Sequence, residues 1–399
     1  MRRFNQIAGA KKIKLKRDLP RLAGLFFCMN EKNTKIRKFV HLENLMLDCG
    51  KSISNFTIAY ETFGKLNNKK NNAILVFHAL TGDQFVCGKN PITNREGWWE
   101  TAVGPEKPLD TNKYFIICAN VLGGCMGSFG PKEVDPKTGK PYGLNFPMIT
   151  IRDMVCAQEK LIESFKIEKL LCVLGGSMGG MQTLQFCATF PNKSHSAVPI
   201  ACSSSHSAQN IALNELARQA IMADPNWNKG NYNSGPKNGL AVARMAGHIS
   251  YLSEKGLQEK FGRKLQEKEN YEFNFDANFQ IESYLRHQGY SFVDRFDANS
   301  YLYITRAMDY FDLGKQYKSG LVEAFKNQKT KFLVISFSTD WLYPTKQSKD
   351  IVIALNASGN DVTFSEIITD KGHDAFLLNE KEFLITLKSF IDSVYKLVI

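Results

Sequence analysis

LLCVLGGSMGGMQTLQF, residues 170–186, is the stretch that decides the fold. It begins with a continuous apolar run, which is typical of a strand buried on both faces of a parallel sheet. Gly175, Ser177 and Gly179 then form the pattern G-x-S-x-G, and a helix-compatible pattern follows. These are the parts of a nucleophile elbow, a strained turn that lifts a serine hydroxyl above the sheet edge. Side chains in place of either glycine would collide with the neighbouring strand and helix.

Buried strand patterns alternate with helical patterns on both sides of this elbow. The apolar runs at 73–79, 114–121 and 331–338 predict strands, and 151–165 has the spacing of an amphipathic helix. This alternation predicts an α/β fold whose mostly parallel sheet carries helices on both faces. Residues 205–307 interrupt it with polar, aromatic-rich helical patterns and no strand of core character. We expect them to form an all-helical cap over the carboxyl edge of the sheet.

Charge separates a basic N-terminal arm from a nearly neutral body. Of the formal net charge of +12, residues 1–38 carry +10, which leaves +2 for the rest of the chain. A nucleic-acid-binding protein is disfavoured because the charge is confined to this arm. We expect the arm to be disordered; the alternatives are a targeting segment and translated sequence before a start at Met29. The predicted domains are therefore the arm, a core of 39–204 and 308–399, and the inserted cap.

Apolar runs and cysteines indicate a cytoplasmic protein. No apolar run reaches the length of about 20 residues that a membrane helix needs, so no membrane contact is expected. The nine cysteines are odd in number and show no CxxC pairing, and several lie within apolar runs. This pattern favours reduced, buried thiols and disfavours a metal site.

Three residues that follow predicted strands form a candidate catalytic triad: Ser177, Asp340 and His373. Their order along the chain is that of alpha/beta hydrolases. A serine hydroxyl is a poor nucleophile at neutral pH, so it needs the histidine to take its proton and a carboxylate to orient that histidine. Asp370 and Asp374 are rival acids, but they are too close in sequence to His373 to reach the back of its ring easily.

Two backbone N–H groups are candidate donors to an oxyanion. The first is that of Met178, the residue after the serine, and the second is that of Leu80, in the loop after the strand at 73–79. His78 in the same region is interpreted as a packed or loop-orienting histidine, because the triad order requires the base far downstream. The triad itself does not distinguish hydrolysis from acyl transfer, since both pass through an acyl-serine.

From about Phe39 to its C-terminus, the chain resembles the homoserine O-acetyltransferase family, alpha/beta-hydrolase-fold enzymes that acylate homoserine for methionine synthesis. The matching stretches are FHALTGD (77–83), ANVLGGCMGSFGP (119–131), GKPYGLNFPMITIRDMV (139–155), GGSMGGMQ (175–182), RQAIMADPNW (218–227), GLAVARMAGHISYLS (239–253), SYLYITRAMDYFD (300–312), DWLYP (340–344) and GHDAFLL (372–378). They are long and ungapped, and they are far more specific than G-x-S-x-G.

The resemblance implies roles for individual residues. Besides the triad and the two oxyanion donors, the substrate-binding arginine of the family falls on Arg244 and its substrate-binding aspartate on Asp374. Homoserine is a zwitterion, so an arginine can hold its carboxylate and an aspartate its ammonium group. The alternative for Arg244 is a packing role on a cap helix, and Arg306 is a weaker candidate for a charge that lines the site.

The resemblance also implies the reaction. Acetyl-CoA, a substrate and not a permanently bound cofactor, would acetylate Ser177, and L-homoserine would then accept the acetyl group in a ping-pong cycle while the cap holds water out. A homodimer through the cap is expected. Succinyl-CoA as donor and serine as acceptor stay open, although Met126 and Met178 resemble the acetyl-using pattern. A carboxylic-ester hydrolase and a catalytically dead binding module are the disfavoured readings.

Overall fold

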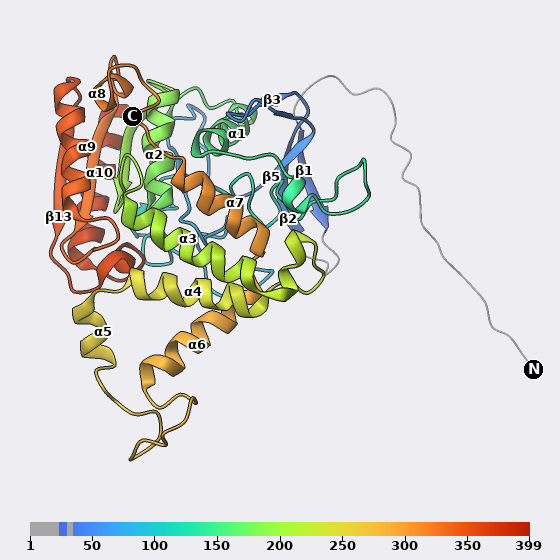
Figure 1. The fold of residues 1–399 in the computed structure, drawn as a ribbon. Coiled ribbons are helices and arrows are strands. Elements are labelled where there is room, and N and C mark those ends of the chain that lie inside the picture. Colours follow the sequence, from blue (N-terminus) through green and yellow to red (C-terminus); the bar gives the residue numbers. More distant parts are fainter. Residues whose placement is uncertain (1–23, 30–34) are drawn as a thin grey trace, which may run out of the picture.

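The computed structural model describes residues 24–29 and 35–399, which are organised around one large sheet (Figure 1). Within these residues the sheet has nine strands, in the spatial order β1 (Gly24–Met29), β2 (Lys35–His41), β5 (Phe56–Phe63), β9 (Phe115–Ala119), β6 (Ala73–Phe77), β10 (Leu170–Gly176), β11 (Ser194–Ile200), β12 (Lys331–Phe337) and β13 (Val362–Ile367). From β9 to β13 in this spatial order, each strand runs parallel to the next. Strands β1, β2 and β5 run antiparallel to the strands beside them. The predicted mostly parallel sheet is confirmed. Two-stranded ladders pair β3 (Leu45–Met46) with β4 (Ser52–Ile53) and β7 (Val103–Gly104) with β8 (Leu109–Asp110).

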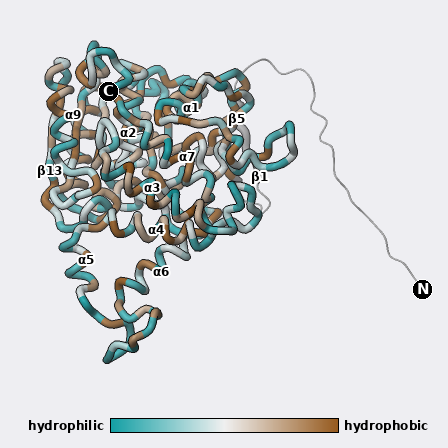
Figure 2. Tube along the Cα trace, viewed as in Figure 1, coloured by the Kyte–Doolittle hydropathy of each residue, from teal (hydrophilic) through white to brown (hydrophobic). Residues whose placement is uncertain are grey.

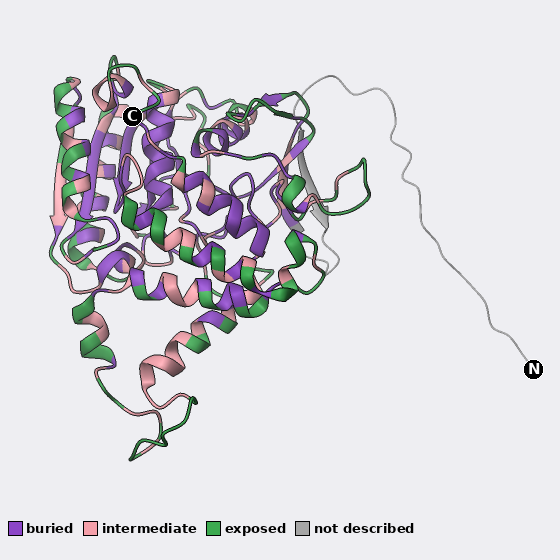
Figure 3. Ribbon diagram, in the orientation of Figure 1, coloured by how far each residue is buried: buried purple, intermediate pink, exposed green. Residues whose placement is uncertain are grey.

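Helices cover both faces of the sheet, and the strands show why. Along β6, Leu75 and Phe77 face one hydrophobic core, while Ile74 and Val76 face another, as the two-residue period of a strand requires. The first core is completed by α1 (Ile151–Ser164), α2 (Met178–Thr189) and α9 (Thr345–Ala357), and the second by α10 (Lys381–Val398). Figure 3 shows these strands buried between the helical layers.

The segment between β11 and β12 is mostly helical. Its helices are α3 (Ala208–Ala223), α4 (Lys237–Tyr251), α5 (Glu254–Lys260), α6 (Gln280–Val293), α7 (Ala298–Asp309) and the short α8 (Leu321–Ala324). The first five fall almost entirely within the predicted cap at 205–307. Helix α4 packs against both α3 and α6, whereas α5 and the start of α6 project away from the body (Figure 1).

Residues 1–38 were predicted to form a disordered arm, but the structure has strands at the C-terminal end of this segment. Strand β1 and the first residues of β2 form an antiparallel pair at the edge of the sheet. Ile36 and Phe39 point into the core, 3% and 0% exposed. The net charge of the segment hid this strand, because Ile36 is buried although basic residues flank it on both sides. The rest of the predicted arm lies outside the described residues.

Two further properties concern membranes and thiols. Across the described ranges, no helix combines the length and the apolar character needed to cross a bilayer. The cysteines from Cys49 onward are free thiols, and Cys118, Cys172, Cys187 and Cys202 are buried. Burial raises the pKa of Cys172 to about 12, so this thiol stays protonated at neutral pH.

Candidate active site

Ser177 lies in a tight turn between β10 and α2. Its backbone has φ 60° and ψ −124°, a region that residues other than glycine rarely adopt. A Cβ atom on Gly175 would lie 2.4 Å from the carbonyl oxygen of Phe77, and one on Gly179 would lie 2.2 Å from the same oxygen. The predicted reason for both glycines is confirmed. The serine itself is buried, 7% exposed.

Asp340 and His373 meet beyond the ends of β12 and β13. His373 Nδ1 donates a hydrogen bond to Asp340 Oδ2 at 2.7 Å, and Asp340 Oδ1 accepts the backbone N–H groups of Leu342 and Tyr343, each at 2.9 Å. Burial tends to lower the pKa of His373, but the charge and hydrogen bond of Asp340 outweigh burial and raise it. The contact places the proton on Nδ1 and leaves Nε2 as the basic nitrogen. The catalytic roles of both residues stay predictions.

The two candidate oxyanion donors belong to residues close to the serine. Met178 is the first residue of α2, so the helix offers its N–H no acceptor. Leu80 lines the same cavity as Ser177. His78 fixes the chain beside Leu80: its Nδ1 donates to Ala79 O at 2.7 Å, and its Nε2 accepts the N–H of Val121 at 3.1 Å. These contacts agree with the loop-orienting interpretation of His78, and burial lowers its pKa to about 4.

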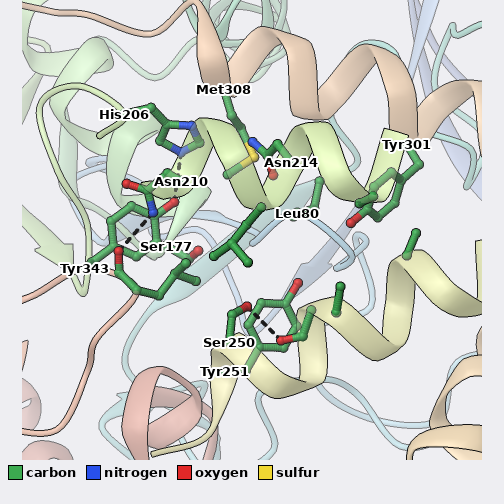
Figure 4. Close-up of a pocket in the computed structure, with 16 residues that line it drawn as sticks. Leu80, Ser177, His206, Asn210, Asn214, Ser250, Tyr251, Tyr301, Met308 and Tyr343 are labelled. Carbon is green, nitrogen blue, oxygen red and sulfur yellow. Dashed lines mark hydrogen bonds between the residues drawn. The ribbon is translucent and has the colours of Figure 1, made fainter. Parts of the chain in front are cut away.

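A small cavity of about 40 Å³ lies beside Ser177 (Figure 4). Cap helices α3, α4 and α7 supply most of its wall, and the loops after β6, β10, β11 and β12 supply the rest. The apolar lining residues include Leu80, Leu213, Ala217, Ala243, Ala246, Met308 and Leu342. The cap therefore roofs the candidate nucleophile with mostly apolar side chains. We call this space the acyl cavity.

A second cavity, of about 240 Å³, is lined by three arginines, Arg95, Arg244 and Arg295. Arg244 Nη1 donates to Thr81 Oγ1 at 3.2 Å, and Arg295 Nη1 donates to Thr81 O at 3.0 Å. Both guanidinium carbons lie 4.9 Å from the ring centroid of Phe292. Leu80 lines the acyl cavity and the adjacent Thr81 lines this one, so the loop they share separates the two spaces. We call the second space the arginine cavity.

Charges in and around the arginine cavity interact strongly. Burial lowers the pKa of Arg295 to about 10, and the neighbouring Arg244 adds to this shift. Burial raises the pKa of Asp83 in the same cavity to about 6, against the opposing effects of a backbone hydrogen bond and Arg295. Burial also raises the pKa of Asp374, against the charges of His373 and Arg244. A cavity that brings guanidinium groups and carboxylates together suits a ligand that carries both a negative and a positive charge.

Arg295 was missed by the sequence analysis. It follows α6 in SFVDRFDANS, and no local pattern marks it, since the contact that brings it to the site is with Thr81, distant in sequence. Arg306, the weaker candidate, lies elsewhere on the cap. It pairs with Glu215 at 3.8 Å and Asp309 at 4.0 Å and lines neither of the two cavities.

Comparison with known proteins gives one family. Residues 72–380 match the family model of the alpha/beta hydrolase fold. The chain is 64% identical over 366 residues to the homoserine O-acetyltransferase of Pelagibacter ubique (strain HTCC1062), covering 91% of this chain and 98% of that protein. Among solved structures it is similar to the homoserine O-acetyltransferase from Bacillus anthracis, with a TM-score of 0.81 and 27% identity over 90% of this chain and 97% of the other. It is also similar to esterase E22, with a TM-score of 0.79 and 29% identity over 89% of this chain and all of the other. The chain belongs to the homoserine O-acetyltransferase family, within the alpha/beta hydrolase fold.

Proposed function

We propose that this chain transfers the acetyl group of acetyl-CoA to the side-chain hydroxyl of L-homoserine, giving O-acetyl-L-homoserine and CoA. The observation that carries the proposal is the 64% identity to a homoserine O-acetyltransferase over nearly the whole of that relative. The arrangement of a buried serine beside one cavity and paired arginines in the next supports it.

In the first half of the cycle, Ser177 attacks the thioester carbonyl of acetyl-CoA. His373 takes the hydroxyl proton through Nε2, while Asp340 stabilises the positive charge that forms on the ring. The N–H groups of Leu80 and Met178 donate to the oxyanion of the tetrahedral intermediate. When that intermediate collapses, His373 returns the proton to the sulfur, CoA leaves as the thiol, and the serine carries an acetyl ester.

In the second half, homoserine resolves this ester. Arg244 and Arg295 hold its carboxylate, and Asp374 holds its ammonium group, which directs the side-chain hydroxyl toward the acetyl-serine. His373 accepts the proton of that hydroxyl as its oxygen attacks the ester carbonyl. It then returns the proton to the Ser177 oxygen as the product leaves. Acetyl-CoA acts here as a substrate, and no resident cofactor is part of the proposal.

The size of the acyl cavity supports acetyl over succinyl as the transferred group. A cavity needs roughly 10–15 Å³ of space open to the centre of a water molecule for each water-sized group that it holds. A volume of about 40 Å³ therefore holds three or four such groups. An acetyl group has three heavy atoms and a succinyl group seven, and the apolar wall suits a methyl group better than a second carboxylate.

Thiol release from acetyl-CoA tests the reaction. We expect release that depends on L-homoserine, is much slower with L-serine or succinyl-CoA, and is lost in Ser177→Ala. Ester hydrolysis is the second candidate function, because the chain is similar to esterase E22. Thiol release that is equally fast without any amino acid would establish hydrolysis instead. Turnover by Ser177→Ala at the wild-type rate would overturn the role of the serine.

We also propose a homodimer formed through the cap, as the family resemblance implies. In support, Phe273 and Phe275 are almost fully exposed in the segment between α5 and α6, which projects from the body (Figure 2). Exposed aromatic side chains of this kind are enriched in protein interfaces. Light scattering should give twice the chain mass of 45.0 kDa. The variant Phe273→Ser/Phe275→Ser should shift the mass toward the monomer, and a wild-type monomer would contradict the proposal.

A further inference from the structure

We infer that Tyr343 is a positioning residue for the triad, and that its hydroxyl is held in place by a hydrogen-bonded pair from the cap side, His206 and Asp309. The inference rests on the proposed function only in taking Ser177 as the nucleophile. It assigns a role to three residues that the mechanism above does not use.

Tyr343 contacts the catalytic machinery at three points. Its backbone N–H donates to Asp340 Oδ1 at 2.9 Å. Its ring lies against the ring of His373, with centroids 5.1 Å apart. Its side chain lines the acyl cavity together with Ser177, and Figure 4 shows the two side chains close together. A displacement of this one ring would therefore be felt by the base and the nucleophile together.

The hydroxyl of Tyr343 is tied to the cap through His206. Its oxygen lies 3.0 Å from His206 Nε2, and His206 Nδ1 lies 3.2 Å from Asp309 Oδ1. Asp309 is the last residue of α7, and it also pairs with Arg218 at 2.7 Å and accepts Asn214 Nδ2 at 2.8 Å. The side chains of His206 and Asp309 are 1% and 4% exposed. The chain of contacts is shielded from water and fixed at its far end by an ion pair with Arg218 and a hydrogen bond from Asn214.

The direction of each hydrogen bond follows from the chemistry of the groups. Burial tends to raise the pKa of Asp309, but hydrogen bonds from His206 and Asn214 and the charge of Arg218 lower it overall, so the group is a carboxylate that only accepts. The His206 nitrogen that faces Asp309, Nδ1, must then carry a proton, and in the tautomer with its proton there Nε2 accepts the hydroxyl of Tyr343. Burial raises the pKa of Tyr343 well above its usual value, so this hydroxyl keeps its proton.

The consequence is an oriented phenol oxygen beside the nucleophile. With its proton directed to His206, the Tyr343 oxygen presents no hydrogen to Ser177, so the lone pairs of the serine oxygen stay free for attack and its proton stays available to His373 Nε2. The same anchor keeps the tyrosine ring against His373. No proton is transferred along Asp309, His206 and Tyr343; these residues only limit the orientations open to Ser177 and His373 before attack.

Acetylation of Ser177 by p-nitrophenyl acetate tests the inference without using either proposed substrate. The burst of p-nitrophenol reports formation of the acetyl-serine. Tyr343→Phe keeps the ring and removes the hydroxyl, so we expect a burst about threefold to tenfold slower, the worth of one neutral hydrogen bond, with unchanged amplitude. Tyr317→Phe is the matched control, since Tyr317 donates to Ala188 O at 2.9 Å away from both cavities, and its burst should match the wild type.

Two variants of His206 separate positioning from simple support of the cap. His206→Gln carries an amide oxygen near the place of Nε2 and can still accept from Tyr343, whereas His206→Asn reaches Asp309 but not Tyr343. We expect His206→Asn to slow the burst about as much as Tyr343→Phe, and His206→Gln to slow it less. The double variant His206→Asn/Tyr343→Phe should be no slower than Tyr343→Phe, because both changes remove the same interaction.

Several outcomes would overturn the inference. They are a wild-type burst rate in Tyr343→Phe, additive losses in the double variant, and a slower burst in His206→Gln than in His206→Asn. Lower thermal stability with an unchanged burst would show that the contacts only attach the cap. A normal burst without homoserine-dependent thiol release would refute the proposed substrates and leave this inference standing. A burst that persists at the wild-type rate in Ser177→Ala would refute Ser177 as the nucleophile and this inference with it.

Discussion

The acyl cavity and the arginine cavity share a wall but differ in every property that bears on chemistry. The first holds about 40 Å³, its lining surface is mostly apolar, and most of its lining residues come from the cap. The second holds about 240 Å³ and is lined mainly by polar and charged side chains from the loops at 79–98, with the two arginines from the cap region. The loop of Leu80 and Thr81 separates them.

This difference indicates how one serine can transfer an acyl group and avoid hydrolysing it. In the proposed mechanism, an apolar space of a few atoms would hold the acetyl group and leave little room for water, while the charged space would recognise an amino acid by its two ionic groups. Discrimination of the donor by size and of the acceptor by charge can then be altered separately. Changes at the triad should slow both half-reactions. Changes in one cavity should leave recognition in the other cavity intact.

The largest effect is expected at the triad, which both cavities serve. Asp340→Asn cannot fix the tautomer of His373, so the nitrophenyl acetate burst and homoserine acetylation should both fall by about 10³- to 10⁴-fold. Asp370→Asn is the matched control for the rival acid and should stay within about twofold of the wild type. A large loss in Asp370→Asn with normal rates in Asp340→Asn would exchange the two assignments.

The next effect should be confined to the arginine cavity. Arg244→Lys and Arg295→Lys keep the charge but lose the planar fork that grips a carboxylate, so the KM for homoserine should rise about 10- to 100-fold in each. The nitrophenyl acetate burst should change less than about twofold. Arg286→Lys, an exposed position on α6, is the control. If the burst slows by the same factor as the KM for homoserine rises, the two cavities do not act separately.

The sequence predicted the parts of this site that depend on local pattern. The elbow at 170–186 combines a buried strand, two glycines and a helix start, and the structure has each of them. Asp340 and His373 follow strands of one parallel sheet, so their side chains were expected at the same edge, and they form a hydrogen bond there. The resemblance supplied Arg244 and Asp374, which no local pattern distinguishes from other charged residues.

The residues that the sequence did not indicate reach the site through long-range packing. Arg295 is positioned by the carbonyl of Thr81, and His206 by Asp309 and Tyr343, each distant along the chain. The strand β1 was missed for a related reason, since it depends on pairing with β2 and not on its own charge or length. Patterns within a segment contain no information about which partner a side chain finds.

A smaller effect should appear when the acyl cavity is enlarged. Leu213→Ala removes bulk from its wall, so the rate with propionyl-CoA relative to acetyl-CoA should rise about fourfold, the usual worth of one buried methylene group. The KM for homoserine should not change. Ile211→Ala, an exposed position on the same helix, should keep the wild-type ratio. An unchanged ratio in Leu213→Ala would show that this cavity does not hold the acyl group.

The smallest effect concerns the wall between the cavities, which His78 supports. Burial lowers the pKa of His78 from 6.5 to about 4, so the unfolded chain binds more protons than the folded chain between these values. The free energy of unfolding should therefore fall as the pH drops below 6.5, by about 1 kcal/mol at pH 5.5 from this residue, until the loss is complete below about pH 4.

His78→Gln retains an acceptor for the N–H of Val121 and cannot titrate. Urea unfolding at pH 5.5 and 7.5 should show a smaller difference in this variant, and part of the fall should remain because burial also lowers the pKa of His248, to about 3. An equal fall in both proteins would mean that His78 is already charged in the folded state, and a charged His78 could not accept the N–H that holds the separating loop in place.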